Sequence, residues 1–137
     1  MTDDFIVKGI DELSLKEFEV KVDEDRGTFR VDTVITNLFN FDLQDCYLIL
    51  VVAPIGIKRK EDKSHKKSYE EYSAELGVLR KGENKCTVVF KGQTSGTYKI
   101  KKCFIKVSHY KYKVPLPQLL KLRELRIQVT LKSHYSK

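Results

Sequence analysis

The stretch "KEFEVKVDEDRGTFRVDTVIT", residues 16–36, decides the fold class. Phe18, Val20 and Val22 alternate with charged residues, and the alternation resumes at Phe29 after an acidic turn that ends in glycine. A period of two places every second side chain on the same face of a strand. Two such runs joined by a turn predict a β-hairpin with one buried face.

The next apolar segment is "CYLILVVAPIGI", residues 46–57, which is unbroken until Pro54. It is of strand length and rich in Val and Ile, so it predicts a central strand buried on both faces. The residues between it and the hairpin, "TNLFNFDLQD" (36–45), are built on Asn and Asp and predict a loop.

Four further segments show strand patterns. They are "YSAELGVL" (72–79), "CTVVFKG" (86–92), "TYKIKKCFIKVSHYKYKV" (97–114) and "ELRIQVTLK" (124–132). The third is one long strand, or two with a bulge. Its apolar residues fall on even numbers up to Ile100 and on odd numbers from Cys103. This change of parity predicts an extra residue near Lys101 and Lys102.

Short strands separated by turns at this spacing predict an all-β protein, an immunoglobulin-like antiparallel β-sandwich of about seven to eight strands. We expect a single domain over residues 1–137, because a chain of this length can bury a sizeable core of its own. Within it we expect a charged mobile loop at 58–72 and a proline-bent C-terminal segment at 114–137 that carries the last strand. "PQLLKLREL" (117–125) is also compatible with one short C-terminal helix.

Catalytic motifs are absent from the sequence. It holds no GxSxG, Walker A, HExxH or Rossmann glycine pattern. Cys103 and His109 lie six residues apart in the same predicted strand, roughly 20 Å when extended, so they cannot form a nucleophile pair. We therefore expect no enzyme activity, no catalytic residues and no cofactor.

The cysteines are an odd set of three, Cys46, Cys86 and Cys103, without a CxxC pair or histidines at ligand spacing. This pattern favours reduced thiols in an intracellular protein, cytoplasmic or nuclear, with no metal site; one disulfide plus a free thiol is the alternative. The opening "MTDDFIVKG" has acids where a secretory signal has bases, and no apolar run is long enough for a membrane span.

Two stretches carry a family resemblance: "FRVDTVITNLFNFDLQDCYLILVVA" (29–53) and "LGVLRKGENKCTVVFKGQTSGTYKIKKCFIKVSHY" (76–110). They resemble intracellular immunoglobulin-like modules such as clathrin-adaptor appendage ("ear") domains and related vesicle-coat sandwiches. The likeness covers about residues 16–110 and lies in strand order and turn chemistry, so it implies a fold first. Because appendage domains bind short peptide motifs, it also implies an adaptor or scaffold role. No residue-level binding motif carries over.

Charge is distributed unevenly along the chain. Residues 1–57 hold twelve acids and five bases, a net of −7, whereas residues 58–137 hold twenty-one bases and seven acids, a net of +14. Such asymmetry indicates either an acidic partner for the basic half or two halves that neutralise each other within the fold. Both interpretations stay open at this point.

The basic half contains the candidate site. In "KIKKCFIKVSHYKYK" (99–113) six lysines and no acid surround three aromatic residues. If Cys103, Ile105 and Val107 point inward, the row that points outward includes Lys102, Phe104, Lys106, Ser108 and Tyr110. Lysines and rings on one sheet face suit a protein or acidic peptide, or single-stranded nucleic acid. Alternatively Phe104 and Tyr110 are covered by the C-terminal segment through Leu116, Leu119 and Leu120.

We therefore predict a non-catalytic protein-protein interaction module, part of a larger intracellular assembly. The alternative is a nucleic-acid-binding domain that uses the lysine and aromatic face. The predicted partner-binding residues are Lys102, Phe104, Lys106, Tyr110 and Lys111, with Lys58, Arg59 and Lys60 as an electrostatic arm on the charged loop.

Overall fold

The computed structural model describes residues 5–7, 11–55 and 69–129. These residues form nine strands and one short helix, which confirms an all-β sandwich. In chain order the elements are β1 (Phe5–Val7), β2 (Leu13–Asp23), β3 (Thr28–Asn37), β4 (Leu43–Pro54), β5 (Glu70–Leu79), β6 (Gly82–Lys91), β7 (Gly96–Val107), β8 (Tyr110–Val114), α1 (Gln118–Leu122) and β9 (Glu124–Ile127).

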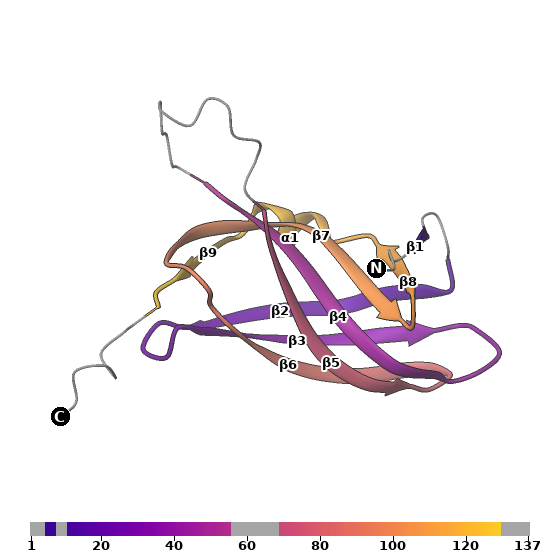
Figure 1. Cartoon of the computed structure of the whole chain (residues 1–137). Coiled ribbons are helices and arrows are strands. Elements are labelled where there is room, and N and C mark those ends of the chain that lie inside the picture. Colours follow the sequence, from indigo (N-terminus) through magenta and orange to yellow (C-terminus); the bar gives the residue numbers. More distant parts are fainter. Residues whose placement is uncertain (1–4, 8–10, 56–68, 130–137) are drawn as a thin grey trace.

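Two sheets face each other, and their strands cross obliquely (Figure 1). The larger sheet has the order β1-β8-β7-β4-β5, with β9 also pairing with β7, and the smaller has the order β2-β3-β6. All pairs are antiparallel except β1 with β8. Each sheet mixes strands from both halves of the chain, as in the immunoglobulin-like layout that the sequence predicts.

The predicted hairpin of residues 16–36 is confirmed as β2 and β3. Its turn contains Gly27 at a φ of 66°, a left-handed conformation that glycine adopts without steric cost. The β2–β3 register shifts between Lys16 and Glu19, and Glu17 there has a φ of 49°. This bulge lies at the start of the alternating run, and Phe18, Val20 and Val22 all pack on the core after it.

The core lies between the two sheets and takes residues from β2 to β9 and α1. The predicted central strand is confirmed as β4, which pairs with β5 on one side and β7 on the other. Its residues 48–52 are all buried, on both faces of the sheet. In the smaller sheet, Phe29 is fully buried and its ring contacts those of Tyr72 and Phe90 at 5.2 Å and 5.1 Å between centroids.

The predicted bulge in residues 97–114 is also confirmed. Val51 pairs with Lys102 and the next residue, Val52, pairs with Ile100, so Lys101 is the extra residue. Beyond it the strand ends earlier than one long strand would, because residues 108 and 109 form a two-residue turn between β7 and β8. This turn and the three-residue β1 raise the strand count above the seven to eight predicted.

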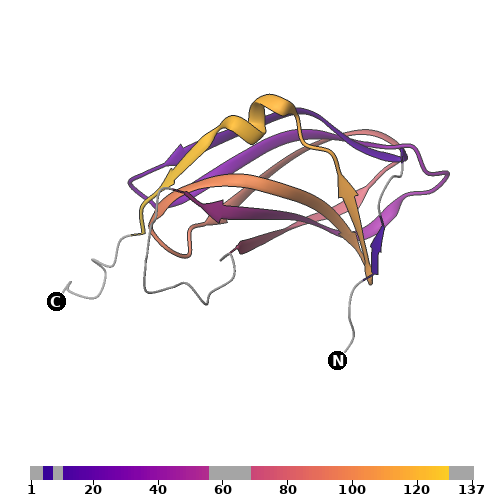
Figure 2. The same cartoon turned by 90° about the horizontal axis from the view of Figure 1, so that it is seen from above.

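The C-terminal segment runs along one rim of the sandwich (Figure 2). The short helix that the sequence allows is present as α1, directly after Pro117. β9 follows α1 and places Leu125 and Ile127 in the core. The end of β9 and the residue after it lie close to two turns: a Cβ added at Gly27 would clash with the Gln128 carbonyl oxygen, and one added at Gly92 would clash with the Ile127 side chain. Among the described residues, the last strand ends at Ile127, whereas the sequence predicts a strand over residues 124–132.

The charged loop predicted at 58–72 is too long at its C-terminal end, because β5 begins at Glu70. Residues 56–68, which include most of that loop, lie outside the described residues. Among the residues that are described, no helix is long and apolar enough to cross a membrane.

Candidate interaction surface

Three of the predicted site residues lie on the outer face of β7, the face turned away from the core. Lys102, Phe104 and Lys106 alternate with the buried Cys103 and Ile105. The register with β4 places Val51, Ile49 and Tyr47 directly beside them, in that order. On the other side of β4, the register with β5 places Glu71, Ser73 and Glu75 beside Val51, Ile49 and Tyr47.

Phe104 points outward but is buried, with 6% of its surface exposed. It forms a small cluster with Ile49 and Val51 that is separate from the core between the sheets. A ring that is enclosed in this way is not available to stack on a base or to enter a partner's pocket. Phe104 therefore lies on the predicted outer face but is buried there, and its role as a partner-binding residue stays a prediction.

Lys111 is one of the groups that cover this cluster. Its side chain crosses from β8, so that the Nζ lies 5.2 Å from the centroid of the Phe104 ring and 3.4 Å from Oε2 of Glu71 on β5. Only 16% of the Lys111 side chain is exposed. Its aliphatic stem shields apolar surface while the ammonium group is paired, a behaviour typical of lysine on an apolar patch. Lys111 thus belongs to the internal packing of this face.

As far as Val129, where the described part of the C-terminal segment ends, no residue of that segment covers Phe104, contrary to the alternative considered for the sequence. Leu120 packs into the core between the sheets, Leu116 contacts that core, and Leu119 is 82% exposed. Leu116 and Leu120 thus lie on the core side of β7, whereas Phe104 is on the outer side.

Tyr110 does not share a face with Phe104. In β7 and β8, Tyr110 pairs with Val107 and Lys111 pairs with Lys106. Residues directly opposite each other in an antiparallel pair point to the same side, so Tyr110 follows the inward parity of Val107. The turn at residues 108–109, where Ser108 has a φ of 57°, reverses the chain and separates the two rings.

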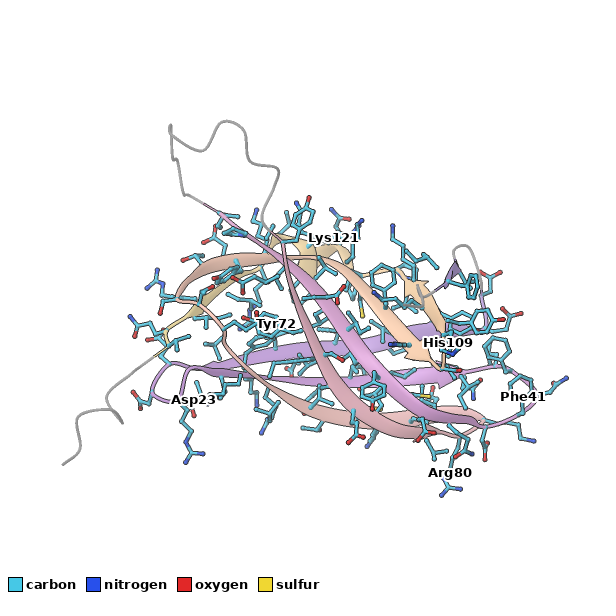
Figure 3. The ribbon with its side chains drawn as sticks, viewed as in Figure 1. Asp23, Phe41, Tyr72, Arg80, His109 and Lys121 are labelled. Atoms are coloured by element: carbon cyan, nitrogen blue, oxygen red, sulfur yellow. The ribbon has the colours of Figure 1, made fainter. Side chains whose placement is uncertain are left out.

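Tyr110 instead joins a row of rings at one end of the sandwich. The row runs from Phe41 to Phe39, Tyr112, Tyr110 and Phe5, with centroid distances of 5.4, 5.9, 6.2 and 5.7 Å in that order. We call these five residues the aromatic end. Figure 3 shows Phe41 and His109 at one end of the molecule and Asp23 at the other end; Tyr110 directly follows His109 in the sequence.

Much of the aromatic end is exposed. Phe5 is 63% exposed, Phe41 56% and Tyr110 48%, whereas Phe39 and Tyr112 are half-buried against the core. Ile6 and Leu38, which are neighbours of these rings in sequence, add 55% and 62% exposed side chains. A globular domain rarely gathers so many large apolar groups on its surface without a use for them.

The sequence folds locally to hold this surface in place. Asn37, 1% exposed, donates from Nδ2 to the carbonyl oxygens of Phe41 and Leu79 and accepts the Phe39 N–H at Oδ1. One buried amide therefore fixes the loop that carries two rings. On the other side, the Phe5 N–H donates to the His109 carbonyl at 2.7 Å and anchors β1 to the β7–β8 turn.

The remaining predicted site residues are not brought into this surface. Lys102 is exposed on the outer face of β7, and Lys106 is half-buried beside it. Lys58, Arg59 and Lys60 lie outside the described residues. Sequence reasoning found Tyr110 but missed Phe5, Phe39 and Phe41, because these come from segments far from it in the chain. The aromatic content of "NLFNF" (37–41) was the one available signal.

A polar cluster at the other end of β7 serves structure. The Glu70 carboxylate accepts hydrogen bonds from the hydroxyls of Thr94, Tyr98 and Tyr72, the last two at 3.1 Å. The Tyr72 hydroxyl in turn accepts the Gln93 N–H at 3.0 Å. Burial raises the pKa of Tyr72 to about 12, so the phenol stays neutral. The cluster ties the β6–β7 turn to β5.

The thiols are not arranged for chemistry either. All three cysteines are free; Cys46 and Cys103 are fully buried and Cys86 is half-buried. Burial raises the pKa of Cys46 to about 11 and raises the pKa of the other two thiols. Neutral thiols are poor nucleophiles and poor metal ligands. Within the described residues, no group of three or more His, Cys, Asp and Glu side chains is placed to hold a metal ion.

Two open hollows flank β6. One, of about 460 Å³, lies between β5 and β6 and is lined by Glu75, Leu76, Val78 and residues 83–88. The other, of about 530 Å³, is lined by residues 17–19, 32–34 and 85–87. Neither hollow is an enclosed apolar pocket of the kind that holds a small molecule.

Comparison with known proteins adds little. Neither a family model nor a curated protein sequence matches the chain. Among solved structures, the chain is similar to the solution structure titled "a putative late embryogenesis abundant (LEA) protein", at 11% sequence identity and a TM-score of 0.44. That match covers 86% of this chain and 71% of the other. A likeness at this level carries no argument about function.

Proposed function

We propose that this protein is a non-catalytic protein-protein interaction module that docks through its aromatic end, as part of a larger intracellular assembly. The observation that carries the proposal is the row of five contacting rings, three of them about half exposed or more, contributed by β1, the β3–β4 loop and β8. Tyr and Phe are enriched at the centres of protein interfaces, where they bury a large area with little loss of side-chain entropy.

The rigidity of the aromatic end supports this role. Asn37 fixes the β3–β4 loop, and Phe39 and Tyr112 are held against the core. Exposed rings that stand on a fixed base need little further ordering when a partner binds, so less of the binding free energy is lost. We expect the partner to present an apolar segment that covers Phe41 and Tyr110.

The resemblance to appendage domains fits the same proposal, because those domains bind short peptide motifs of other proteins. The nucleic-acid alternative is less well supported. It needs exposed rings among lysines on one face, whereas Phe104 on the lysine-bearing face is buried and Tyr110 has the opposite parity. We therefore assign the partner contact to the aromatic end.

A photo-crosslinking experiment tests the proposal. A photoreactive phenylalanine analogue replaces Phe41 or Tyr110 in the full chain, and Leu122, which is 61% exposed on α1, serves as the matched control position. We expect the same protein to be captured at positions 41 and 110 and to be absent at position 122. The affinity of that protein is then measured against the Phe41→Ala variant, and we expect a loss on the order of tenfold or more.

Binding to nucleic acid would contradict the proposal. Fluorescence anisotropy with a labelled single strand at about 50 and 200 mM salt separates the two functions. Binding that is tight at the lower salt, collapses at the higher and is unchanged by Phe41→Ala would assign the function to the lysines. Equal affinity of the captured protein for wild type and the Phe41→Ala variant would also reject the aromatic end.

A further inference from the structure

The smaller sheet ends in a strand whose outer edge has no partner. β6 pairs with β3 on one side only, and in the described part of the chain no strand pairs with its other side. The β3–β6 register runs over ten consecutive residue pairs, from Thr28 with Lys91 to Asn37 with Gly82, without a shift. β6 is therefore a long and regular edge with unpaired backbone groups.

The other edge strands are protected. β1 has three residues and β9 has four, which is too short to hold an added strand. β2 is interrupted by the bulge at Glu17. β5 shifts register twice against β4 and holds Gly77 at a φ of 82°. Bulges and short strands are the usual ways in which proteins prevent edge-to-edge pairing. β6 has neither of them.

The outward side chains of β6 are complementary in charge to those of a second β6 that runs antiparallel to it. Glu83, Lys85, Thr87, Val89 and Lys91 form one exposed row, with an acid at one end, a base at the other and Thr87 in the middle. Val89, the one apolar member of this row, is 59% exposed. If the row is turned by 180° about Thr87, Glu83 of one chain comes to lie opposite Lys91 of the other.

We propose that β6 pairs antiparallel with β6 of a second copy of this chain, about a twofold axis that passes through Thr87. The pairing places Glu83 opposite Lys91 of the second copy and Lys85 opposite Val89 of the second copy, each twice by symmetry. Opposite charges across an antiparallel pair stabilise it. The two three-stranded sheets become one six-stranded sheet, and both cores lie on the same side of it because paired residues have the same parity.

The hollow beside β6 supports this placement. The hollow between β5 and β6 is lined by residues 83–88 of β6 and, on the β5 side, by Leu76 and Val78, of which Val78 is 42% exposed. A second copy seated on β6 brings its own β5 next to this hollow and covers it. An isologous contact of this kind is the commonest way in which soluble proteins form dimers.

The oligomeric state of the full chain is the first test. We expect analytical ultracentrifugation to show a dimer that dissociates on dilution. Lys91→Glu puts like charges opposite each other at two places and should weaken the dimer about tenfold. The double variant Glu83→Lys/Lys91→Glu should restore it. Lys101→Glu, the same charge change at an exposed position on β7, should have no effect.

Crosslinking tests the register. In a Cys86→Ser background, Thr87→Cys should form a disulfide-linked dimer when glutathione disulfide oxidises the two thiols, because the paired Cα atoms lie within disulfide range. Lys85→Cys should not, because the two copies of position 85 are about 14 Å apart along the strands.

Three results would overturn the proposal. The first is a chain that stays monomeric at concentrations on the order of 100 µM, above the range of most specific complexes. The second is a dimer that Lys91→Glu leaves unchanged. The third is a disulfide-linked dimer of Lys85→Cys but not of Thr87→Cys. The inference is independent of the proposed function, since Phe41→Ala should leave the dimer intact.

Discussion

The outer faces of the two sheets are both rich in charged residues, yet they are built differently. On the larger sheet, Ile49, Val51 and Phe104 form a second small core, and Lys111 crosses it to reach Glu71. On the smaller sheet, the charged side chains form ion pairs with each other: Lys16 on β2 with Glu83 on β6, and Arg30 with Asp32 along β3. Charged residues in an alternating strand pattern thus produce either a covered apolar cluster or an ionic network, and the strand neighbours decide which.

The ionic network of the smaller sheet is exposed. Lys16 and Glu83 form an ion pair of 2.7 Å in which more than half of each side chain is exposed. Asp32 accepts hydrogen bonds from Arg30 at 3.1 Å and from Thr87 at 2.7 Å. Exposed ion pairs contribute little because water and salt screen them. We therefore expect stability to depend on the cluster around Phe104 far more than on these pairs.

Truncation of Phe104 gives the largest expected effect. Phe104→Ala removes a 6% exposed ring and leaves Ile49 and Val51 without their third partner. We expect a loss of about 3 kcal/mol in the free energy of unfolding, the low end for a buried phenylalanine. Urea denaturation with an unchanged m-value provides the measurement.

Leu119→Ala is the control for this change, because Leu119 is 82% exposed. It should change the free energy of unfolding by no more than about 0.5 kcal/mol. A cost below about 1 kcal/mol for Phe104→Ala would mean that the outer face of the larger sheet behaves like the smaller one, and the contrast between the two faces would fail.

Phe104 also shows how far the sequence alone could predict this face. Its outward direction follows from alternation with Cys103 and Ile105, and the bulge at Lys101 follows from the change of parity. Its burial depends on Ile49 and on Lys111, which lie on neighbouring strands. That information is in the register between strands, which a single sequence does not contain.

The second prediction separates the two parts of Lys111. Lys111→Ala removes the stem that covers the Phe104 ring and should cost about 1–2 kcal/mol. Lys111→Met keeps most of the stem and loses only the contacts of the ammonium group with Glu71 and the ring, so it should cost about 0.5 kcal/mol. Lys102→Ala and Lys102→Met, at an exposed position on the same face, are the controls for the two changes. An equal loss in the two variants would show that the charge, and not the packing, stabilises this face.

The aromatic end illustrates a different limit of sequence analysis. "VSHYKY" (107–112) has no glycine or asparagine to mark a two-residue turn, so the sequence suggests continued alternation from Phe104 to Tyr110. The turn at Ser108 moves Tyr110 to the other side of the sheet. Its ring contacts then come from Phe5, more than a hundred positions earlier in the chain, and from Tyr112, which is two positions later.

The smallest effect is expected for the ion pair between Lys16 and Glu83 on the smaller sheet. The hydrogen bond and charge of Glu83 raise the pKa of Lys16 above 10.5, and the same contact lowers the pKa of Glu83. The contribution of Glu83 is present above its unfolded-state pKa of about 4 and is lost as the pH falls through its lower folded-state value. The contribution of Lys16 is complete below pH 10.5 and is lost as the pH rises through the folded-state pKa.

The free energy of unfolding of the double variant Lys16→Ala/Glu83→Ala should therefore differ most from that of wild type between these two pH limits and at low salt. Urea midpoints at pH 7 and at about pH 3, each with and without about 1 M salt, provide the measurement. We expect the urea midpoint of the double variant to be slightly below that of wild type at pH 7. Salt should remove this difference, and the lower pH should reduce it. A deficit that is as large as that of Lys111→Ala, or that persists in high salt, would show that the pair is shielded from solvent. The two faces would then differ in composition but not in how they contribute to stability.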